Sequence, residues 1–355
     1  MKSKKNPIAI LVNDLHLNKD NGELVKNIFH QALLLADGIG VDYIFIGGDV
    51  FTNRSGQPLS CLIDLSNMIE SAKKMDKKVI AIPGNHDKTD ASDESSYLDI
   101  FDCENFEVVS RFRLISFDKC VVGFIPYFND ERWIHEFNLL NRYKRDILSG
   151  DVIDKQSFLI THMGMDGVMN NDGTIVTSEI KSDMFFGSWN KVLVGHYHNA
   201  SKVGKNIYYT GSAYQGNFGE TIEDKGFTIM YDDGSIESVQ STFPHYIKYV
   251  VDVNDSESLM DIINGYKDNK VDNIRIVFRG SRTDLQKINV SEMNGYGFDC
   301  KFEANEKIEA MSESNMNIVM SYDKKSIMSD FLNFCKENDI KGDMKAYGIK
   351  LLKLI

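Results

Sequence analysis

Five short motifs in the sequence contain side chains that can bind metal ions. They are NDLH, GGD, GNHD, THMG and GHYH, and they hold five of the eight histidines of the chain. Each motif in isolation is usually a turn or a helix cap. Five of them in order, each after an apolar run, indicate a single metal-binding site instead. The candidate residues are Asp14, His16, Asp49, Asn85, His86, Asp87, His162, His196 and His198.

The spacing within the motifs suits chelation. Asp14 and His16 are two residues apart, so both side chains point to the same face while the chain stays extended. His196 and His198 repeat this arrangement. Asp49 follows two glycines, which let neighbouring backbone approach closely, and its two carboxylate oxygens can each bind a different ion. The motifs therefore predict two adjacent metal ions.

The ligand types indicate which ions bind and what chemistry follows. A mixture of imidazole, carboxylate and amide ligands favours manganese, iron or zinc over calcium and magnesium, and we expect manganese. Two such ions about 3.5 to 4 Å apart activate water for attack on phosphorus, because they lower its pKa from about 15.7 toward roughly 7. The five cysteines form no CxxC pair, which argues against a thiolate zinc site.

The predicted elements place these motifs at the ends of strands. Apolar runs predict strands at 8–12, 43–46, 79–82, 121–125, 158–160, 192–194, 207–209 and 227–231, and a DDGS turn joins the last of them to a strand at 236–239. Amphipathic spacing predicts helices at 25–36 and 59–75. Ligands in α/β sheets collect beyond the carboxyl ends of strands. The pattern therefore predicts an α/β fold with two packed sheets and a site at their edge.

The pattern changes at residue 245. Residues 1–244 form the predicted catalytic domain. Residues 245–310 form a small α/β unit with a strand at 247–253, a helix at 256–266 and a strand at 273–278. Residues 311–355 form a polar linker and two helical segments at 326–336 and 344–354.

Composition limits the partners and the compartment. The chain has 355 residues and a net charge of −12, which does not suit a protein that binds nucleic acid alone, because Lys and Arg must neutralise the phosphates. Cations bound by carboxylates would reverse this charge locally. Scattered cysteines in odd number suit the reducing cytoplasm. The apolar run at 8–12 is too short for a signal peptide, and no stretch reaches membrane-spanning length.

The five motifs in this order resemble the calcineurin-like metallophosphoesterase superfamily, whose blocks read DxH, GD, GNH[DE], H and GHxH. The resemblance covers residues 8–244 and implies a two-sheet β-sandwich flanked by helices. It also implies two sets of metal ligands that share one aspartate. The first set is Asp14, His16, Asp49 and His198, and the second is Asp49, Asn85, His162 and His196.

The same resemblance separates the remaining histidines by role. His86 would face the phosphate as the catalytic acid, and Asp87 would fix its tautomer. His30, His135 and His245 stand outside the motifs, and we interpret them as structural.

Within this superfamily the sequence is most similar to the SbcD-like nuclease subunits of double-strand-break repair and to their shorter bacteriophage counterparts in recombination. The segments GGDVFTNRSGQP at 47–58, IPY at 125–127 and YYTGSAYQGNFGETIEDKGF at 208–227 carry this similarity. It implies a DNA nuclease, an exonuclease that can also act as an endonuclease, in recombination, repair or replication. Residues 245–310 would be a capping domain that recognises DNA. The protein would be cytoplasmic, in the host cytoplasm if a phage encodes it.

The similarity also implies protein partners. C-terminal helices of the family bind an SMC-like, SbcC-type ATPase, and the segment 311–355 fits this role. Family members also form homodimers through helices near the second motif. The helix at 59–75 is therefore a candidate dimer interface, with burial in the core of the monomer as the alternative.

The sequence departs from the family at one position. Several relatives have His or Asp three residues after the shared aspartate, where this chain has Thr52. Threonine cannot act as an acid near neutral pH, so the balance between exonuclease and endonuclease action stays open. Thr52 and Arg54 are candidate contacts to phosphate or DNA, and solvation of the loop is the alternative for Arg54.

Two other functions compete with a DNA nuclease. A phosphodiesterase or phosphatase for small nucleotides would use the same chemistry and would suit the negative charge, but would rarely need the 110 residues after His245. A scaffold subunit that binds DNA ends without cleaving them would have lost metal ligands, and none of the seven proposed ligands is missing.

Overall fold

The computed structural model describes residues 5–149, 155–171, 173–269 and 271–304. The helices predicted at 326–336 and 344–354 lie outside these residues. The chain divides into two compact units: the first is Met1–Lys248, Tyr266–Arg275 and Gly297–Asp299, and the second is Tyr249–Gly265, Ile276–Tyr296 and Cys300–Ile355. The domain boundaries after 244 and 310 remain predictions.

The first unit contains two six-stranded sheets. The first sheet has the order β12-β11-β1-β2-β3-β4, with β1 (Pro7–Val12), β2 (Tyr43–Ile46), β3 (Lys78–Ala81), β4 (Phe106–Val108), β11 (Gly226–Tyr231) and β12 (Ile236–Gln240). The second has the order β5-β6-β7-β8-β10-β9, with β5 (Arg113–Ser116), β6 (Cys120–Ile125), β7 (Gln156–His162), β8 (Lys191–Gly195), β9 (Ser201–Val203) and β10 (Ile207–Tyr209).

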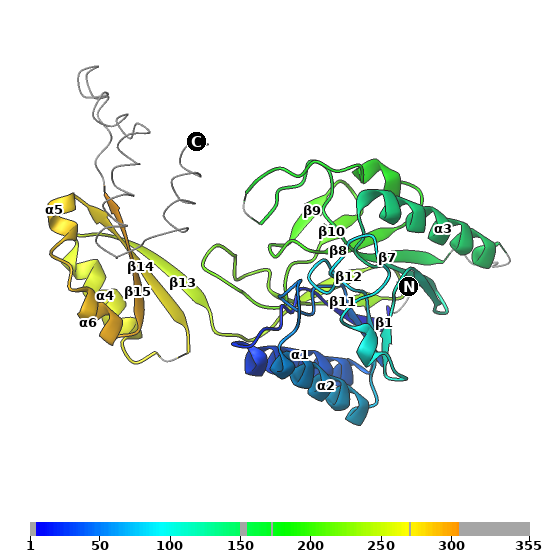
Figure 1. Ribbon diagram of the computed structural model, residues 1–355, viewed down its shortest axis with the longest axis horizontal. Helices are drawn as coiled ribbons and strands as arrows, with labels where there is room; N and C mark the ends of the chain where they lie inside the picture. The colour runs from blue at the N-terminus through cyan, green and yellow to red at the C-terminus, as the bar shows by residue number, and fades with distance from the viewer. Residues whose placement is uncertain (1–4, 150–154, 172, 270, 305–355) are drawn as a thin grey trace, which may run out of the picture. The chain divides into compact units, whose positions relative to one another are not determined.

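Alternate residues of the strands pack the layers together. Leu11, Phe45 and Ile80 of the first sheet meet Phe124 and Phe158 of the second in one core cluster. The opposite face of the first sheet is covered by α1 (Gly22–Ile39) and α2 (Leu59–Lys74), and that of the second by α3 (Asp130–Leu148). Figure 1 shows α1 and α2 together on one side of the sheets and α3 on the other. This arrangement confirms the predicted two-sheet sandwich flanked by helices.

Parallel pairing brings the ends of the motif-bearing strands together. β1, β2 and β3 pair in parallel, and so do β6, β7 and β8. Parallel strands end at the same edge of a sheet, and the five motifs follow or complete β1, β2, β3, β7 and β8. The topology therefore delivers all five motif loops to neighbouring edges.

Several elements were not predicted. The helix α3 begins after Asn129, whose side chain accepts a hydrogen bond from the backbone N–H of Arg132, and buries Trp133, Phe137 and Leu140. Most of its other residues are polar, which weakens the amphipathic pattern in the sequence. The strands β4, β5 and β9 and the 3₁₀ helices Asp99–Phe101 and Ser182–Phe185 span three or four residues each, too few to show a periodicity.

A three-stranded sheet with the order β13-β14-β15 follows the sandwich in the sequence. Its strands are β13 (Tyr246–Asp252), β14 (Asn273–Gly280) and β15 (Phe298–Ala304), and its helices are α4 (Ser256–Tyr266), α5 (Arg282–Leu285) and α6 (Val290–Gly295). The first strand, helix and second strand lie where the sequence predicted them, and β15 was missed. Among the described residues, no helix combines the length and the apolar character that crossing a bilayer requires.

Candidate metal centre

Four of the five motif loops line one cleft of about 890 Å³, and His162 of the fifth is buried behind it, 3.1 Å from Asn85. The backbone N–H of Asp14 donates to the carbonyl of Gly48 at 3.2 Å, and that of His16 donates to the carbonyl of Asp49 at 3.0 Å. Asp14, His16 and Asp49 have left-handed backbone conformations, with φ of 53°, 46° and 51°, and His196 has a φ of 96°. The expectation that Asp14 and His16 share one face of an extended chain is therefore wrong. Sharp turns, held by the neighbouring loop, bring these side chains together.

The first cluster joins Asp14, His16 and His198, whose ligand atoms lie within 4.8 Å of one another. Nε2 of His16 lies 2.9 Å from Nε2 of His198, 3.9 Å from Oδ1 of Asp14 and 3.7 Å from Oδ2 of Asp49. Ligands that share an ion at about 2.0 to 2.2 Å must approach one another in this way.

The second cluster joins Asp49, His162 and His196, and the amide of Asn85 completes it. Oδ1 of Asn85 lies 3.1 Å from Nε2 of His162 and 2.9 Å from Nδ1 of His196, and Nε2 of His162 lies 3.3 Å from Oδ2 of Asp49. Oδ2 of Asp49 thus faces both clusters, while Oδ1 accepts a hydrogen bond from the backbone N–H of His86 at 2.8 Å. The expectation of one carboxylate oxygen for each ion is wrong, because a single oxygen lies between the clusters.

The charge of the centre fits a divalent cation. Asp14 and Asp49 are both buried, and within the described part of the chain neither forms an ion pair with Lys or Arg. Burial raises the pKa of Asp14 to about 6. Burial also acts to raise the pKa of Asp49, but the neighbouring imidazoles, His162 foremost, hold it well below its usual range. Buried carboxylates need a compensating positive charge, which a cation bound by oxygen and nitrogen would supply.

The imidazoles keep nitrogen lone pairs available for such an ion. Burial lowers the pKa of His16 to about 4 and that of His196 to about 3, so both rings are neutral at pH 7. Burial also acts to lower the pKa of His162, but Asp49 and Asp14 raise it to about 9. A metal ion would displace that proton, because it binds the deprotonated ring. Nδ1 of His162 donates to the carbonyl of Gly47 at 2.9 Å, which leaves Nε2 facing the centre.

His86 lines the same cleft, and its hydrogen bond distinguishes it from the ligands. Nδ1–H donates to the carbonyl oxygen of Thr52 at 2.5 Å, so Nε2 is left for the cleft. A ring nitrogen of His86 also lies within 4.8 Å of the ligand atoms of His16 and Asp49. His86 is therefore close enough to act on a group held between the clusters.

Asp87 does not have the predicted role. Its carboxylate accepts hydrogen bonds from the backbone N–H groups of Val50, Phe51 and Gly84, at 3.1, 2.9 and 2.9 Å. Burial raises its pKa to about 7, and the charge of Asp49 adds to this rise. The expectation that Asp87 fixes the tautomer of His86 is wrong: Asp87 ties two motif loops together, and the Thr52 carbonyl orients His86.

The two candidate phosphate contacts differ. The hydroxyl of Thr52 donates to the carbonyl of His16 at 2.6 Å, so its hydrogen is not available to a phosphate. Thr52 still lines the cleft, and its contact to phosphate or DNA stays a prediction. Arg54 is exposed and lines the cleft, and within the described residues its guanidinium has no ion pair. Arg54 can therefore reach a bound phosphate.

Glu220 belongs to the centre, although the sequence motifs did not identify it. Its Oε1 accepts a hydrogen bond from Nδ1 of His198 at 2.9 Å. Burial acts to raise the pKa of Glu220, but the hydrogen bond from His198 and the charge of Lys225 lower it to about 2. The residue falls in the FGE part of the segment 208–227, so family similarity was the one signal that pointed to it.

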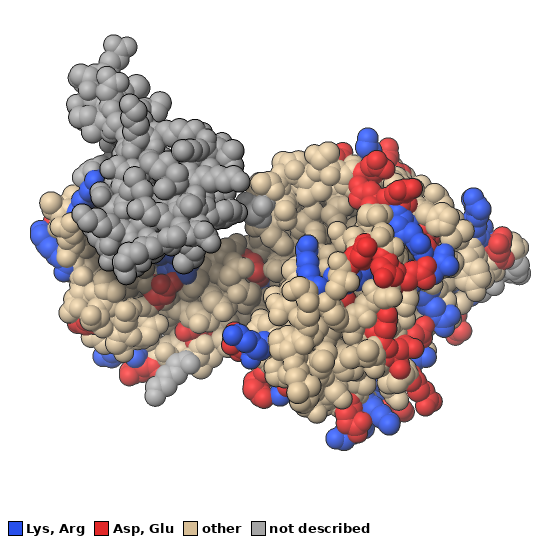
Figure 2. Space-filling model, viewed as in Figure 1, with Lys and Arg blue, Asp and Glu red and all other residues tan. Residues whose placement is uncertain are grey.

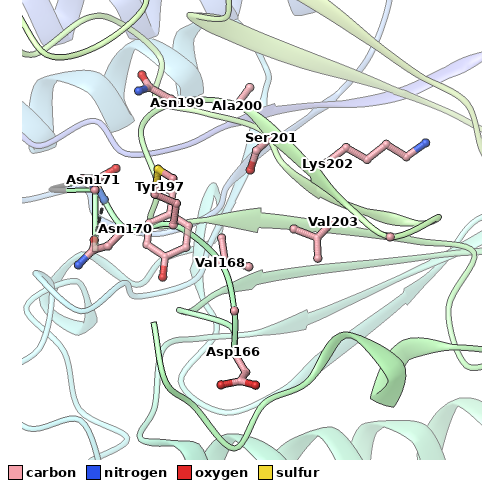
Figure 3. A pocket seen from close by; sticks show the side chains of 14 residues that line it. Asp166, Val168, Asn170, Asn171, Tyr197, Asn199, Ala200, Ser201, Lys202 and Val203 are labelled. Carbon is pink, nitrogen blue, oxygen red and sulfur yellow. Dashed lines mark hydrogen bonds between the residues drawn. The ribbon is translucent and has the colours of Figure 1, made fainter. Parts of the chain in front are cut away.

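A second hollow of about 580 Å³ lies beside the cleft, and Asn170 and Asn171 line both. Figure 3 shows Asn170, Asn171 and Tyr197 at one end of this hollow and Lys202 and Val203 at the other. The side chain of Asn171 donates to the carbonyl of His196 at 3.2 Å and accepts from the N–H of His198 at 2.9 Å. Asn171 therefore fixes the backbone of the GHYH loop from outside the centre.

Glycine is required where the loops touch. A Cβ atom on Gly84 would lie 2.3 Å from the backbone nitrogen of Asp49 and 2.2 Å from its Oδ1, and one on Gly195 would lie 2.5 Å from the carbonyl oxygen of Gly47. By contrast, His30 and His135 are exposed on α1 and α3, and neither they nor His245 lines the cleft.

Residues 9–218 match the family profile described as calcineurin-like phosphoesterase. The chain belongs to this family. A protein named "Putative phosphoesterase 244L", of Invertebrate iridescent virus 6, is 24% identical over 284 residues, which cover 77% of this chain and 93% of that protein. Family membership makes the chain a hydrolase of the phosphoester class.

Two further matches concern nucleases. A component of the SbcCD nuclease of Staphylococcus saprophyticus is 25% identical over 213 residues, which cover 53% of this chain and 54% of that protein. The crystal structure of Pseudomonas putida nuclease MPE aligns at 16% identity with a TM-score of 0.28, over 56% of this chain and 66% of that chain. This chain thus spans about half of the first of these relatives.

Proposed function

We propose that this phosphoesterase is a DNA nuclease that uses two divalent metal ions, most simply Mn²⁺. The observation that supports this proposal is the approach of two ligand clusters that share Oδ2 of Asp49 at the floor of an open cleft. The first ion would bind the set with Asp14, and the second the set with Asn85, as the family resemblance implies.

The metal ions would supply an activated water and would neutralise the phosphate as its charge grows. The protein itself contributes positioning and proton transfer. Thr52 holds Nδ1–H of His86, so Nε2 faces the cleft. As an imidazolium, His86 also carries a hydrogen on Nε2, which it can donate to the leaving oxygen. Arg54 lines the cleft and can bind a phosphate oxygen through its guanidinium.

DNA as the substrate rests on the nuclease relative and on the sequence similarity of three segments. Figure 2 shows Lys and Arg interspersed with Asp and Glu over the visible face of the phosphoesterase unit, rather than gathered into a stripe. Such a surface binds a polyanion weakly. We therefore propose that the chain acts on DNA in recombination or repair together with an SbcC-like ATPase, which the C-terminal residues would bind.

The helix α2 is compatible with both of its predicted roles. It buries Cys61, Leu65 and Met68 against the core, while Leu59 and Ile63 are 71% and 52% exposed. One face therefore stabilises the monomer, and the opposite face offers apolar side chains to a homodimer, which remains a proposal.

A phosphodiesterase for small nucleotides is the second candidate. Arg54 is the one Lys or Arg side chain among the described residues that line the cleft, which suits a substrate with few phosphates. A DNA strand would be expected to meet several basic side chains.

The deciding assay presents both substrates to one preparation. Purified protein with Mn²⁺ is incubated with end-labelled linear DNA and, separately, with a bis-aryl phosphodiester, each with and without the ATPase. We expect cleavage of DNA, stronger with the ATPase, and none by an Asp49→Asn variant, which loses the shared ligand. Hydrolysis of the small ester without any cleavage of DNA would favour the second candidate.

A further inference from the structure

Glu220 is held from several sides at the back of the proposed metal centre. Oε1 accepts a hydrogen bond from the side chain of Asn217 at 2.8 Å, in addition to the one from His198. Oε2 accepts a hydrogen bond from the backbone N–H of Gly216 at 3.0 Å and forms an ion pair with Lys225 at 3.1 Å. Each oxygen thus has two donors. The carboxylate therefore has a fixed place relative to the imidazole of His198.

The bond to Glu220 decides which nitrogen of His198 faces the cleft. An ionised carboxylate only accepts hydrogen bonds, so Nδ1 of His198 carries a hydrogen. In the neutral ring, which is the form that binds a metal ion, Nε2 then carries the lone pair. Nε2 lies 2.9 Å from Nε2 of His16, inside the first cluster. Four imidazoles are proposed as ligands. Among the described residues, His198 is the one of them that is hydrogen-bonded to a carboxylate that is not itself a proposed ligand.

Lys225 connects Glu220 to the backbone of the ligand. Its side chain is fully buried, and its ammonium contacts Glu220, the hydroxyl of Ser212 at 3.0 Å and the carbonyl oxygen of His198. A buried ammonium is tolerated only when it is paired and hydrogen-bonded. Lys225 therefore fixes both the main chain of His198 and the carboxylate that orients its ring.

We propose that Glu220, held by Lys225, is the positioning residue that orients His198 for the first metal ion. This inference rests on the proposed function, since it needs an ion in the first cluster. A carboxylate behind a ligating imidazole fixes the ring and makes it a stronger ligand, and the loss of such a partner lowers metal affinity about 10- to 100-fold.

A purely structural role is the competing explanation, because Glu220 also closes the turn at 216–220. The double variant Glu220→Gln/Lys225→Met separates the two explanations. Each single variant leaves an unpaired or mismatched buried group and should lower the midpoint of urea unfolding. The double variant removes both charges together and should recover much of that midpoint, but it cannot restore the carboxylate behind His198.

The test measures Mn²⁺ binding by calorimetry on the full chain, with urea unfolding alongside. We expect two ions in the wild type. Glu220→Gln and the double variant should each bind one of them about 10- to 100-fold more weakly. Glu223→Gln is the matched control, the same exchange at an exposed position three residues away. The ¹⁵N shifts of the His198 ring, recorded without metal and at a pH where the ring is neutral, give a second measurement. They should move from the single Nδ1–H tautomer to a mixture of tautomers in Glu220→Gln.

Two results would overturn the inference. The first is a Glu220→Gln variant that binds both Mn²⁺ ions with wild-type affinity. The second is a double variant that recovers its Mn²⁺ affinity together with its midpoint of urea unfolding. Either result would show that Glu220 is only a structural residue. A wild-type chain that binds no ion would overturn the metal centre itself, so the two failures are distinguishable.

Discussion

At the scale of residues, the chemistry of the centre depends on which atom each side chain leaves free. His86, His162 and His198 each have one ring nitrogen occupied by an oxygen acceptor, from Thr52, Gly47 and Glu220 respectively. These acceptors lie far from the histidines in sequence. The identity of the site residues could be predicted from motif letters. The two backbone acceptors could not, because a carbonyl leaves no trace in the sequence, and Glu220 lies outside the five motifs.

The exchange His86→Ala tests the role of this residue. We expect kcat to fall by about 100-fold or more, because the proton donor to the leaving oxygen is lost, while two ions remain bound. Metal content by mass spectrometry and turnover of the small phosphodiester should be measured together. His30→Ala, at an exposed site on α1, should change neither value. Loss of an ion in His86→Ala would instead identify His86 as a metal ligand. A ring nitrogen of His86 lies close enough to the ligand atoms of His16 and Asp49 for that role.

At the scale of elements, the site depends on loops that touch through their backbones. The strands at 43–46 and 207–209 agree with the prediction at both ends, because their apolar runs are continuous and bounded by polar residues. The helix α3 was missed, since its polar residues conceal a buried stripe of Trp133, Phe137 and Leu140. The left-handed turns at Asp14 and Asp49 were also missed, because only the contact between the two loops imposes them.

Two Gly→Ala exchanges test whether these loop contacts are required. Gly84→Ala should lower the free energy of unfolding by about 1 to 3 kcal/mol, because the new methyl group would overlap the backbone of Asp49. It should also weaken Mn²⁺ binding, since Asp49 must move. Gly38→Ala is the control. Gly38 lies within α1, and a Cβ atom built on it would have no neighbouring atom within 4 Å. This exchange should therefore raise the free energy of unfolding by about 0.5 to 1 kcal/mol. Urea titrations measure the free energy of unfolding of both variants. A wild-type value for Gly84→Ala would refute close packing of the loops.

At the scale of the whole molecule, the proposed metal ions would stabilise one unit and not the other. All three candidate clusters found among the described residues lie in the first unit. The composition and the motifs predicted a second unit after residue 244, but its role in recognising DNA rests on family similarity alone.

Heating the chain in Mn²⁺ and in EDTA tests this division. We expect two transitions, with only one raised by Mn²⁺, because an ion that binds the folded centre at 100 times its Kd adds about 2.7 kcal/mol to that unit. Differential scanning calorimetry measures both. Asp49→Asn should lose the shift and keep the second transition. An equal shift of both transitions would show that the units unfold as one.

The left-handed backbone at Asp14, His16 and Asp49 has a further consequence. Residues other than Gly are disfavoured there by about 1 to 3 kcal/mol each, with Asn and Asp less disfavoured than most, so these residues oppose folding while they provide the ligands. In a library of variants selected for abundance in cells alone, glycine and asparagine should therefore accumulate at these three positions. Selection for phosphoester hydrolysis should remove the same variants. The difference between the two selections would therefore identify the catalytic loops from sequence data alone.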